Sequence, residues 1–228
     1  MIELERNGDV FVLRMRDGEN KLNRPFLDRL NEALDDVEGS DGPAALVTTG
    51  DERFYSTGLD LGWLATQQGP AIRAFLTDLH RLLARLMAFP MATVAALNGH
   101  TFAAGAFIAL AHDYRVMRED KGFVCLPEID LAMGQPLTPG FYAVLDARLP
   151  RSTSHEMLVT GRRYTAPQAL ERRIVDQIAS ESELLPRAVE LAQGLASKHR
   201  ATFGAIKRGL FEAELAKLEA PLPDWLGT

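Results

Sequence analysis

Short apolar runs alternate with helical periods along the first 130 residues of the chain. Residues 10–15 lie between two turn sequences, and residues 44–48 and 91–97 are apolar runs, so each of the three predicts a strand. Asn23 is the expected cap of the first helix, with Pro25 in its first turn. The two helical faces comprise Phe26, Leu27, Leu30, Leu34 and Val37, and then Ile72, Phe75, Leu79, Leu82, Leu83 and Leu86. Strands that alternate with helices indicate an α/β core.

A third helix and two more strands complete this core. Residues 102–111 are small and apolar on every side, which predicts a fully buried helix. Residues 114–117 and 123–126 have the composition of strands.

Helical spacing dominates the last third of the chain. The caps expected there are Ser152 and Ser182. One helix has an apolar side of Leu185, Leu191, Ala192 and Leu195, and a last helix carries Ile206, Leu210, Phe211, Leu215 and Leu218. We therefore divide the chain into a core, residues 1–137, with the binding and catalytic loops, and a mainly helical region, residues 138–228, that serves oligomerisation.

Composition excludes several classes of protein. The chain has 228 residues and a net charge of −6, and it has no long basic run, so we expect no nucleic-acid partner. No apolar stretch is long enough to span a bilayer, and the N-terminus has no secretory signal. Cys125 is the only cysteine, which excludes an intrachain disulfide and favours a reducing compartment. These features predict a cytoplasmic protein with no membrane association.

Three segments contain residues suited to catalysis, namely residues 56–60, 98–106 and 126–131. The first two place small residues between a strand and a helix, where free backbone N–H groups can approach a ligand closely. Two such groups converging on one oxygen make an oxyanion hole. The third segment places Glu128 beside an apolar run, where loss of solvent raises the pKa of a carboxyl group towards that of a useful base.

In this order and spacing, the three segments resemble the crotonase superfamily, the enoyl-CoA hydratases and isomerases, over residues 2–219. Residues 53–60 are similar to the family's first oxyanion loop. Residues 98–105 are similar to its second, and Pro127-Glu128-Ile129 matches its catalytic segment. The resemblance implies a crotonase-like spiral of ββα units with a helical C-terminal region. It also implies a homotrimer or a dimer of trimers.

The resemblance also implies a role for individual residues. Leu59 and Ala104 supply the oxyanion N–H groups, and Glu128 is the catalytic base. The residues expected to bind the acyl-CoA thioester are Lys21, Leu22, Arg53, Ser56, Thr57, Gly58, Asp60, Gly105 and Phe107. Coenzyme A belongs to the substrate, so no separate cofactor is expected.

One departure from the family pattern narrows the expected reaction. Hydratases of the family use two glutamates, and the position of the first is Phe107 here, which cannot move a proton. The turn after the catalytic segment, residues 132–140, also has an altered register. One carboxylate suits a one-base proton shuttle, as in the family's Δ3-Δ2 enoyl-CoA isomerases. The alternatives are hydration or another crotonase reaction, and a non-catalytic relative that binds acyl-CoA.

The remaining polar residues are predicted to be structural. We expect His100 to be packed and hydrogen-bonded, Asp130 to be solvated or to cap a helix, and Cys125 to be a buried, inert thiol. His112 and Asp113 form a polar pair at the entry to a strand. The histidines expected at the surface are His80, His155 and His199. No cluster has metal-ligand spacing, so no metal is predicted.

Overall fold

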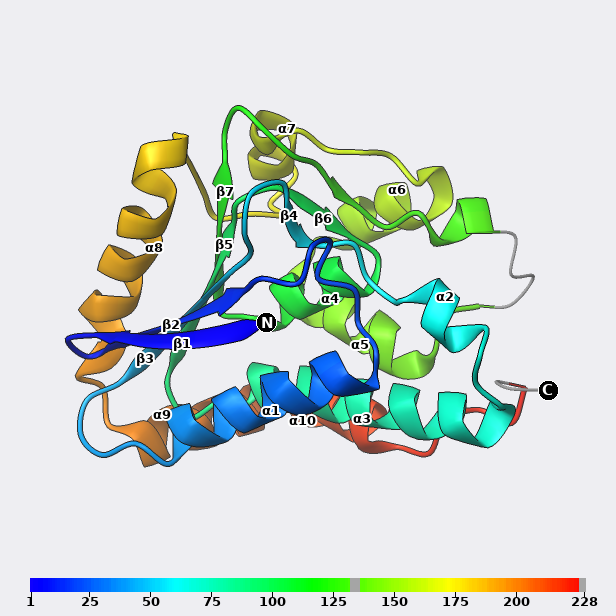
Figure 1. The fold of residues 1–228 in the computed structure, drawn as a ribbon, viewed down its shortest axis with the longest axis horizontal. Coiled ribbons are helices and arrows are strands. Elements are labelled where there is room, and N and C mark those ends of the chain that lie inside the picture. The colour runs from blue at the N-terminus through cyan, green and yellow to red at the C-terminus, as the bar shows by residue number, and fades with distance from the viewer. Residues whose placement is uncertain (132–135, 226–228) are drawn as a thin grey trace.

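The computed structural model describes residues 1–131 and 136–225, which form a six-stranded sheet, a three-stranded sheet and the helices around them (Figure 1). The larger sheet has the order β1-β2-β3-β5-β7-β9. Its strands are β1 (Ile2–Asn7), β2 (Val10–Met15), β3 (Ala45–Thr49), β5 (Ala92–Leu97), β7 (Tyr114–Arg118) and β9 (Gln177–Ala179). The hairpin β1–β2 is antiparallel and every other pair is parallel.

The smaller sheet pairs β4 (Phe54–Ser56), β6 (His100–Phe102) and β8 (Val124–Cys125) in parallel. Each of these strands follows a strand of the larger sheet and precedes a helix. The helices in question are α3 (Gly69–Met87), α4 (Ala104–Ala111) and α5 (Pro139–Arg148). The chain thus repeats a ββα unit, and the predicted spiral of such units is confirmed. Because the repeats are parallel, the carboxyl ends of all three short strands lie at the same edge.

The two faces of the larger sheet are covered by different helices. On one face, α1 (Arg24–Glu38), α3 and α4 form the main core with α10 (Glu212–Glu219). Asn23 caps α1 as predicted, because its side chain accepts the N–H of Phe26 at 3.0 Å. On the other face, α8 (Glu181–Ala196) lies across β2, β3, β5, β7 and β9 (Figure 1). No helix in residues 1–131 and 136–225 has the length and apolarity needed to cross a membrane.

The predicted apolar side of α8 is confirmed at Ala192 and is otherwise displaced from the buried row. The buried residues are Leu184, Ala188, Ala192 and Ala196. These side chains repeat every fourth residue, and their small size lets the helix lie close to the sheet. The larger leucines of the prediction are only partly buried beside this row. The helix begins after Ser180 rather than after Ser182, and α6 (Arg151–Thr160) begins after Pro150 rather than after Ser152.

The predicted last helix is two helices, α9 (Arg200–Leu210) and α10, which meet at Phe211. Leu215 and Leu218 of α10 are buried as the spacing predicts. On α9 the side chains of Ile206 and Leu210 are 65% and 70% exposed, so the prediction that they face the core is wrong. The buried face of α9 instead holds Lys207, whose ammonium group lies 2.9 Å from Asp113. A buried ion pair, and not apolar spacing, therefore orients this helix.

The C-terminal helices share the core of the first 137 residues. β9 extends the larger sheet, α8 covers one of its faces, and α10 packs against α3 and α5. A further short helix, α7 (Ala166–Glu171), precedes β9. The part of this region that the structure describes therefore supports the sheet directly, and the oligomerisation role predicted for it stays a prediction.

Candidate active site

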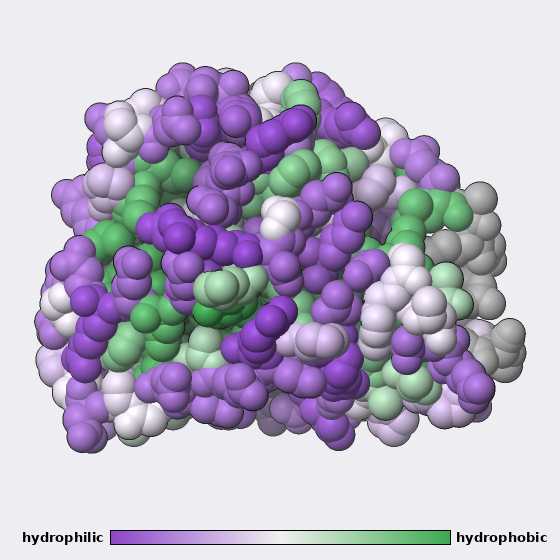
Figure 2. Space-filling model, in the orientation of Figure 1, coloured by the Kyte–Doolittle hydropathy of each residue, from purple (hydrophilic) through white to green (hydrophobic). Residues whose placement is uncertain are grey.

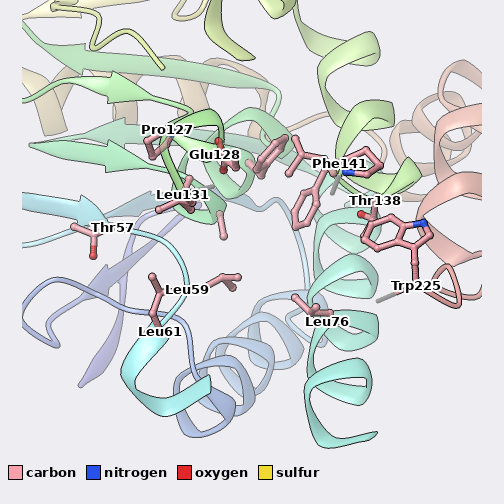
Figure 3. A pocket seen from close by; sticks show the side chains of 15 residues that line it. Thr57, Leu59, Leu61, Leu76, Pro127, Glu128, Leu131, Thr138, Phe141 and Trp225 are labelled. Atoms are coloured by element: carbon pink, nitrogen blue, oxygen red, sulfur yellow. The ribbon is translucent and has the colours of Figure 1, made fainter. Parts of the chain in front are cut away.

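A largely apolar pocket of about 240 Å³ opens beside the carboxyl ends of the small sheet's strands (Figure 3). Its walls come from the loops after β4, β6 and β8, from α3 and α5, and from the C-terminal segment. The lining residues are Thr57, Leu59, Leu61, Leu76, Ala103, Ala104, Phe107, Pro127, Glu128, Leu131, Pro136, Leu137, Thr138, Phe141 and Trp225. The volume lies below the about 300–1,000 Å³ of sites that enclose a whole drug-sized ligand. The pocket therefore suits the reacting end of a larger molecule.

The loop after β4 is held by backbone hydrogen bonds to Leu22 and by the hydroxyl of Ser56. The N–H of Leu22 donates to the carbonyl of Gly58 at 2.8 Å, and the N–H of Asp60 donates to the carbonyl of Leu22 at 2.9 Å. The hydroxyl of Ser56 accepts the N–H of Gly58 at 3.2 Å, and Gly58 has a φ of 91°, which favours glycine. Among the described residues, none accepts the N–H of Leu59. This donor is therefore left for a ligand at the pocket wall.

The loop after β6 places a second unpaired donor beside the first loop. Ala103 precedes α4 with a φ of 50°, a conformation that costs an alanine about 1–3 kcal/mol. Its carbonyl accepts the N–H groups of Ala106 and Phe107, while the N–H of Ala104 finds no acceptor in residues 1–131 or 136–225. A Cβ atom added to Gly58 would lie 3.0 Å from the nitrogen of Ala104. The two loops are therefore in contact beside the N–H group of Ala104.

Glu128 is the acidic residue of the pocket. It follows Pro127 and begins a short 3-10 helix, Glu128–Leu131. The residue as a whole is half-buried, but its Oε2 atom is buried and makes no hydrogen bond to any described residue. Burial raises the pKa of this carboxyl group to about 7. Such a group exists in both protonation states near neutral pH, which suits a residue that accepts and returns a proton.

Phe107 forms an apolar wall of the same pocket. It is 1% exposed on α4, and its ring centroid lies 4.5 Å from that of Phe141 on α5. Leu76 and Leu137 extend the apolar surface. This wall removes solvent from the region of Glu128, which is the cause of its raised pKa.

Five of the residues predicted for the site line this pocket. They are Leu59, Ala104, Glu128, Thr57 and Phe107. Leu22, Ser56, Gly58 and Gly105 are instead buried beneath the two loops. Ser56, for example, donates from its hydroxyl to the carbonyl of Asn20 at 2.8 Å. We conclude that these four hold the loops in place and do not line the pocket.

The other three predicted residues do not line the pocket. Asp60 caps α2 (Leu61–Leu64), because its side chain accepts the N–H of Trp63 at 3.0 Å. Lys21 is exposed and pairs with Glu19 at 3.2 Å, and Arg53 is exposed at the start of β4. Neither cation lines the pocket, so a role for them in binding acyl-CoA stays a prediction.

The part of the pocket formed by α2, α3, the start of α5 and the C-terminal segment was not predicted from the sequence. Its residues are Leu61, Leu76, Leu137, Thr138, Phe141 and Trp225. His80 was predicted at the surface, which is wrong: it is 2% exposed, and its Nε2 atom lies 2.8 Å from the hydroxyl of Thr138. Burial lowers the pKa of His80 to about 4, so the ring is neutral at physiological pH. Leu76 and Phe141 gave a signal, but helical spacing cannot separate a pocket wall from the core.

The other polar residues lie outside the pocket. Cys125 is buried, donates to the carbonyl of Gly161, and has a pKa raised to about 11 by burial, so its prediction as an inert thiol is confirmed. His112 is buried against the hydroxyl of Thr48, while Asp113 pairs with Lys207, and the two serve as structural residues.

His100 and Asp130 are also outside the pocket lining. His100 packs against three phenylalanines, its ring stacking on Phe123 at 5.6 Å, as predicted. Its Nδ1 atom is buried with no hydrogen bond to a described residue, so the predicted bond is not found at that atom. Asp130 is exposed, which agrees with a solvated residue.

Known proteins are similar to this chain in sequence and in fold. A family model described as enoyl-CoA hydratase/isomerase matches residues 5–221. The chain is 32% identical over 223 residues to enoyl-CoA delta isomerase 2, peroxisomal, of Arabidopsis thaliana, and the match covers 92% of each protein. It is 33% identical over 216 residues to carnitinyl-CoA dehydratase of Salmonella paratyphi A, covering 90% of this chain and 78% of that protein. A probable enoyl-CoA hydratase of Mycobacterium tuberculosis superposes with a TM-score of 0.89 at 26% identity, covering 96% and 92% of the two chains.

The chain therefore belongs to the enoyl-CoA hydratase/isomerase family, and with it to the crotonase superfamily of enzymes. The family resemblance drawn from the three sequence segments is confirmed.

Proposed function

We propose that the enzyme converts 3-enoyl-CoA to 2-enoyl-CoA by moving one proton with Glu128. The observation that carries the proposal is the chemistry of the pocket. Among its described lining residues, Glu128 is the only carboxylate, and Phe107 stands where a second acid would be needed to add water. An apolar wall excludes the water molecule that hydration requires and keeps the base poorly solvated.

The proposed reaction needs one base and one oxyanion site. The carboxylate of Glu128 takes a proton from C2 of the 3-enoyl thioester, and the electron pair of that C–H bond gives a dienolate. The N–H groups of Leu59 and Ala104 donate to the thioester oxygen, on which negative charge develops. Glu128 then returns the proton to C4, and the double bond moves from the 3- to the 2-position. The same proton is removed and replaced, so the proposal invokes no further cofactor.

Hydration or dehydration is the second candidate. One relative is named an isomerase and another a dehydratase at nearly equal identity, so the names do not separate the reactions. The composition of the pocket favours isomerisation, because hydratases of this family use two glutamates. A third candidate is a protein that binds acyl-CoA without reaction.

A panel of CoA esters with mass-spectrometric and chromatographic readout tests these candidates. We expect 3-enoyl-CoA to be converted to 2-enoyl-CoA at unchanged mass. We expect 2-enoyl-CoA to gain no water over the same time. Hydration of 2-enoyl-CoA at a rate equal to isomerisation would contradict the proposal. Binding of acyl-CoA with no turnover would support the third candidate.

The raised pKa of Glu128 predicts the pH dependence of the reaction. Only the carboxylate can take the C2 proton, and its pKa is about 7. We expect kcat/KM to rise about tenfold per pH unit below this pKa and to level off above it, since kcat/KM reports the ionisation of the free enzyme. Initial rates between pH 5 and pH 9 give the profile. A midpoint near 4.5, the ordinary value for glutamate, would contradict the assignment.

The proposal also includes the oligomeric state and the cellular location of the enzyme. We propose a homotrimer or a dimer of trimers, supported by the exposed apolar side chains of Ile206 and Leu210 on α9. Charged and polar residues cover most of the face in Figure 2, with apolar side chains gathered between them. A cytoplasmic location stays a prediction; the Arabidopsis relative is named peroxisomal.

A further inference from the structure

The end of the pocket opposite Thr57 is formed by a segment far away in sequence. Trp225 lies there beside Thr138, with Leu76 of α3 below them (Figure 3). Thr57 lies at the other end of the pocket, and Leu59 and Glu128 lie between the two ends. A thioester oxygen held by Leu59 and Ala104 would direct the acyl chain along this axis.

The segment that carries Trp225 is fixed to α3 by one arginine. The guanidinium group of Arg73 donates from Nη1 to the carbonyl of Leu222 at 2.7 Å and from Nη2 to the carbonyl of Pro223 at 2.9 Å. Leu222 is 6% exposed and packs in the main core. Two charge-assisted bonds and one buried side chain therefore hold the backbone two to three residues before Trp225.

Arg73 lies closer to these two carbonyl groups than to any acidic side chain among the described residues. Its nearest acidic partner is Asp224, at 4.0 Å, and that side chain is fully exposed. An exposed pair of this kind contributes little stability, whereas the two carbonyl bonds are part-buried. The main effect of Arg73 is therefore to hold the C-terminal segment in position.

We propose that Trp225, held in place by Arg73, closes the acyl end of the pocket and sets the longest acyl chain that the enzyme accepts. The substrates are then acyl-CoA thioesters of short or medium length. This inference rests on the proposed acyl-CoA binding and does not depend on which reaction follows. The pocket volume of about 240 Å³ agrees with a limited chain that ends at this wall.

The test compares two variants with the wild type over acyl chains of four to sixteen carbons. Calorimetry with saturated acyl-CoA measures how well each chain length binds when no reaction takes place. The kcat/KM for 3-enoyl-CoA measures the chain-length preference during turnover. Trp225→Ala removes the wall, and Arg73→Gln releases the segment without changing a wall residue. We expect both to raise the preference for twelve carbons over six by at least about tenfold, the lower limit for one methylene in a tight pocket.

Arg81→Gln is the matched control. Arg81 lies two turns farther along α3, is exposed and, among the described residues, pairs with Asp78, so its loss should leave the chain-length profile unchanged. Identical profiles in the wild type and both variants would overturn the inference. A shifted binding profile in an enzyme without isomerase activity would support the inference and refute the isomerisation. Failure of the wild type to bind any acyl-CoA would overturn both.

Discussion

Replacing Glu128 with glutamine lowers kcat/KM for the isomerisation of 3-enoyl-CoA by about 10²–10⁴-fold, the range typical of a lost acid–base group. The amide has nearly the shape of the carboxylate but cannot take the C2 proton. Glu128 is the only carboxylate among the described lining residues, so none of these can replace it. Initial rates with 3-enoyl-CoA measure the loss. The affinity for saturated acyl-CoA should change little, because Leu59, Ala104 and the apolar walls remain.

A stability measurement separates this loss from misfolding. The pKa of Glu128 is about 7 in the folded protein and near 4.5 otherwise, so the folded state binds more protons between these values. The contribution of Glu128 to the stability of the wild type therefore falls as the pH rises from 4.5 through 7, and the glutamine variant lacks this contribution. At pH 8 the variant should be more stable by on the order of 1–3 kcal/mol, with the gain disappearing near pH 4.

Two results would contradict the assignment. Near wild-type activity in Glu128→Gln would show that another group moves the proton. If Glu128→Gln is less stable than the wild type at pH 8 and also inactive, Glu128 is needed for folding and the loss of activity does not identify it as the base. Asp130→Asn is the matched control, because Asp130 lies two residues away on the same short helix but is exposed. It should retain activity.

The sequence predicted the parts of the site that depend on local backbone. The small residues of the two loops indicated that backbone N–H groups could meet a ligand there, and the family resemblance then assigned Leu59 and Ala104 as the donors. Glu128 could be found because it follows an apolar strand and matches a family segment. Phe107 could be identified through the same family resemblance, because it occupies the position of the first glutamate of the hydratases. Buried strands of the larger sheet were equally clear, since their apolar runs are short and bounded by turns.

The sequence could not predict contacts between distant segments. His80 lies beside charged residues on α3, and it is buried because α5 packs over it, with Phe141 against its ring and Thr138, 58 residues later, hydrogen-bonded to it. Trp225 belongs to no periodic pattern, and the segment before it is bonded to Arg73 through a carbonyl 149 residues away from that arginine. On α9, a buried ion pair of Lys207 overrides the apolar spacing. Each of these depends on tertiary packing, which spacing along the chain does not report.

Replacing Gly58 with valine lowers isomerisation by about 10²–10³-fold, the cost of losing one oxyanion donor. Gly58 has a φ of 91°, a conformation that β-branched residues rarely adopt. Its new Cβ atom would lie 2.9 Å from the Cβ atom of Ala103 and 3.0 Å from the nitrogen of Ala104. The two loops would have to separate, and the donors of Leu59 and Ala104 could no longer hold the same oxygen.

Two variants show whether the effect arises at the donors. Leu59→Ala changes the side chain beside Gly58 and keeps the backbone N–H, so it should lower kcat by less than about tenfold if the donor is what matters. Gly42→Val imposes similar backbone strain, at a φ of 79°, in an exposed turn with no atom within 4 Å of the added Cβ. It should lower stability and leave kcat unchanged. If Gly58→Val loses no more activity than Gly42→Val, the contact between the two loops does not stabilise the enolate, and the oxyanion site must be sought elsewhere in the pocket.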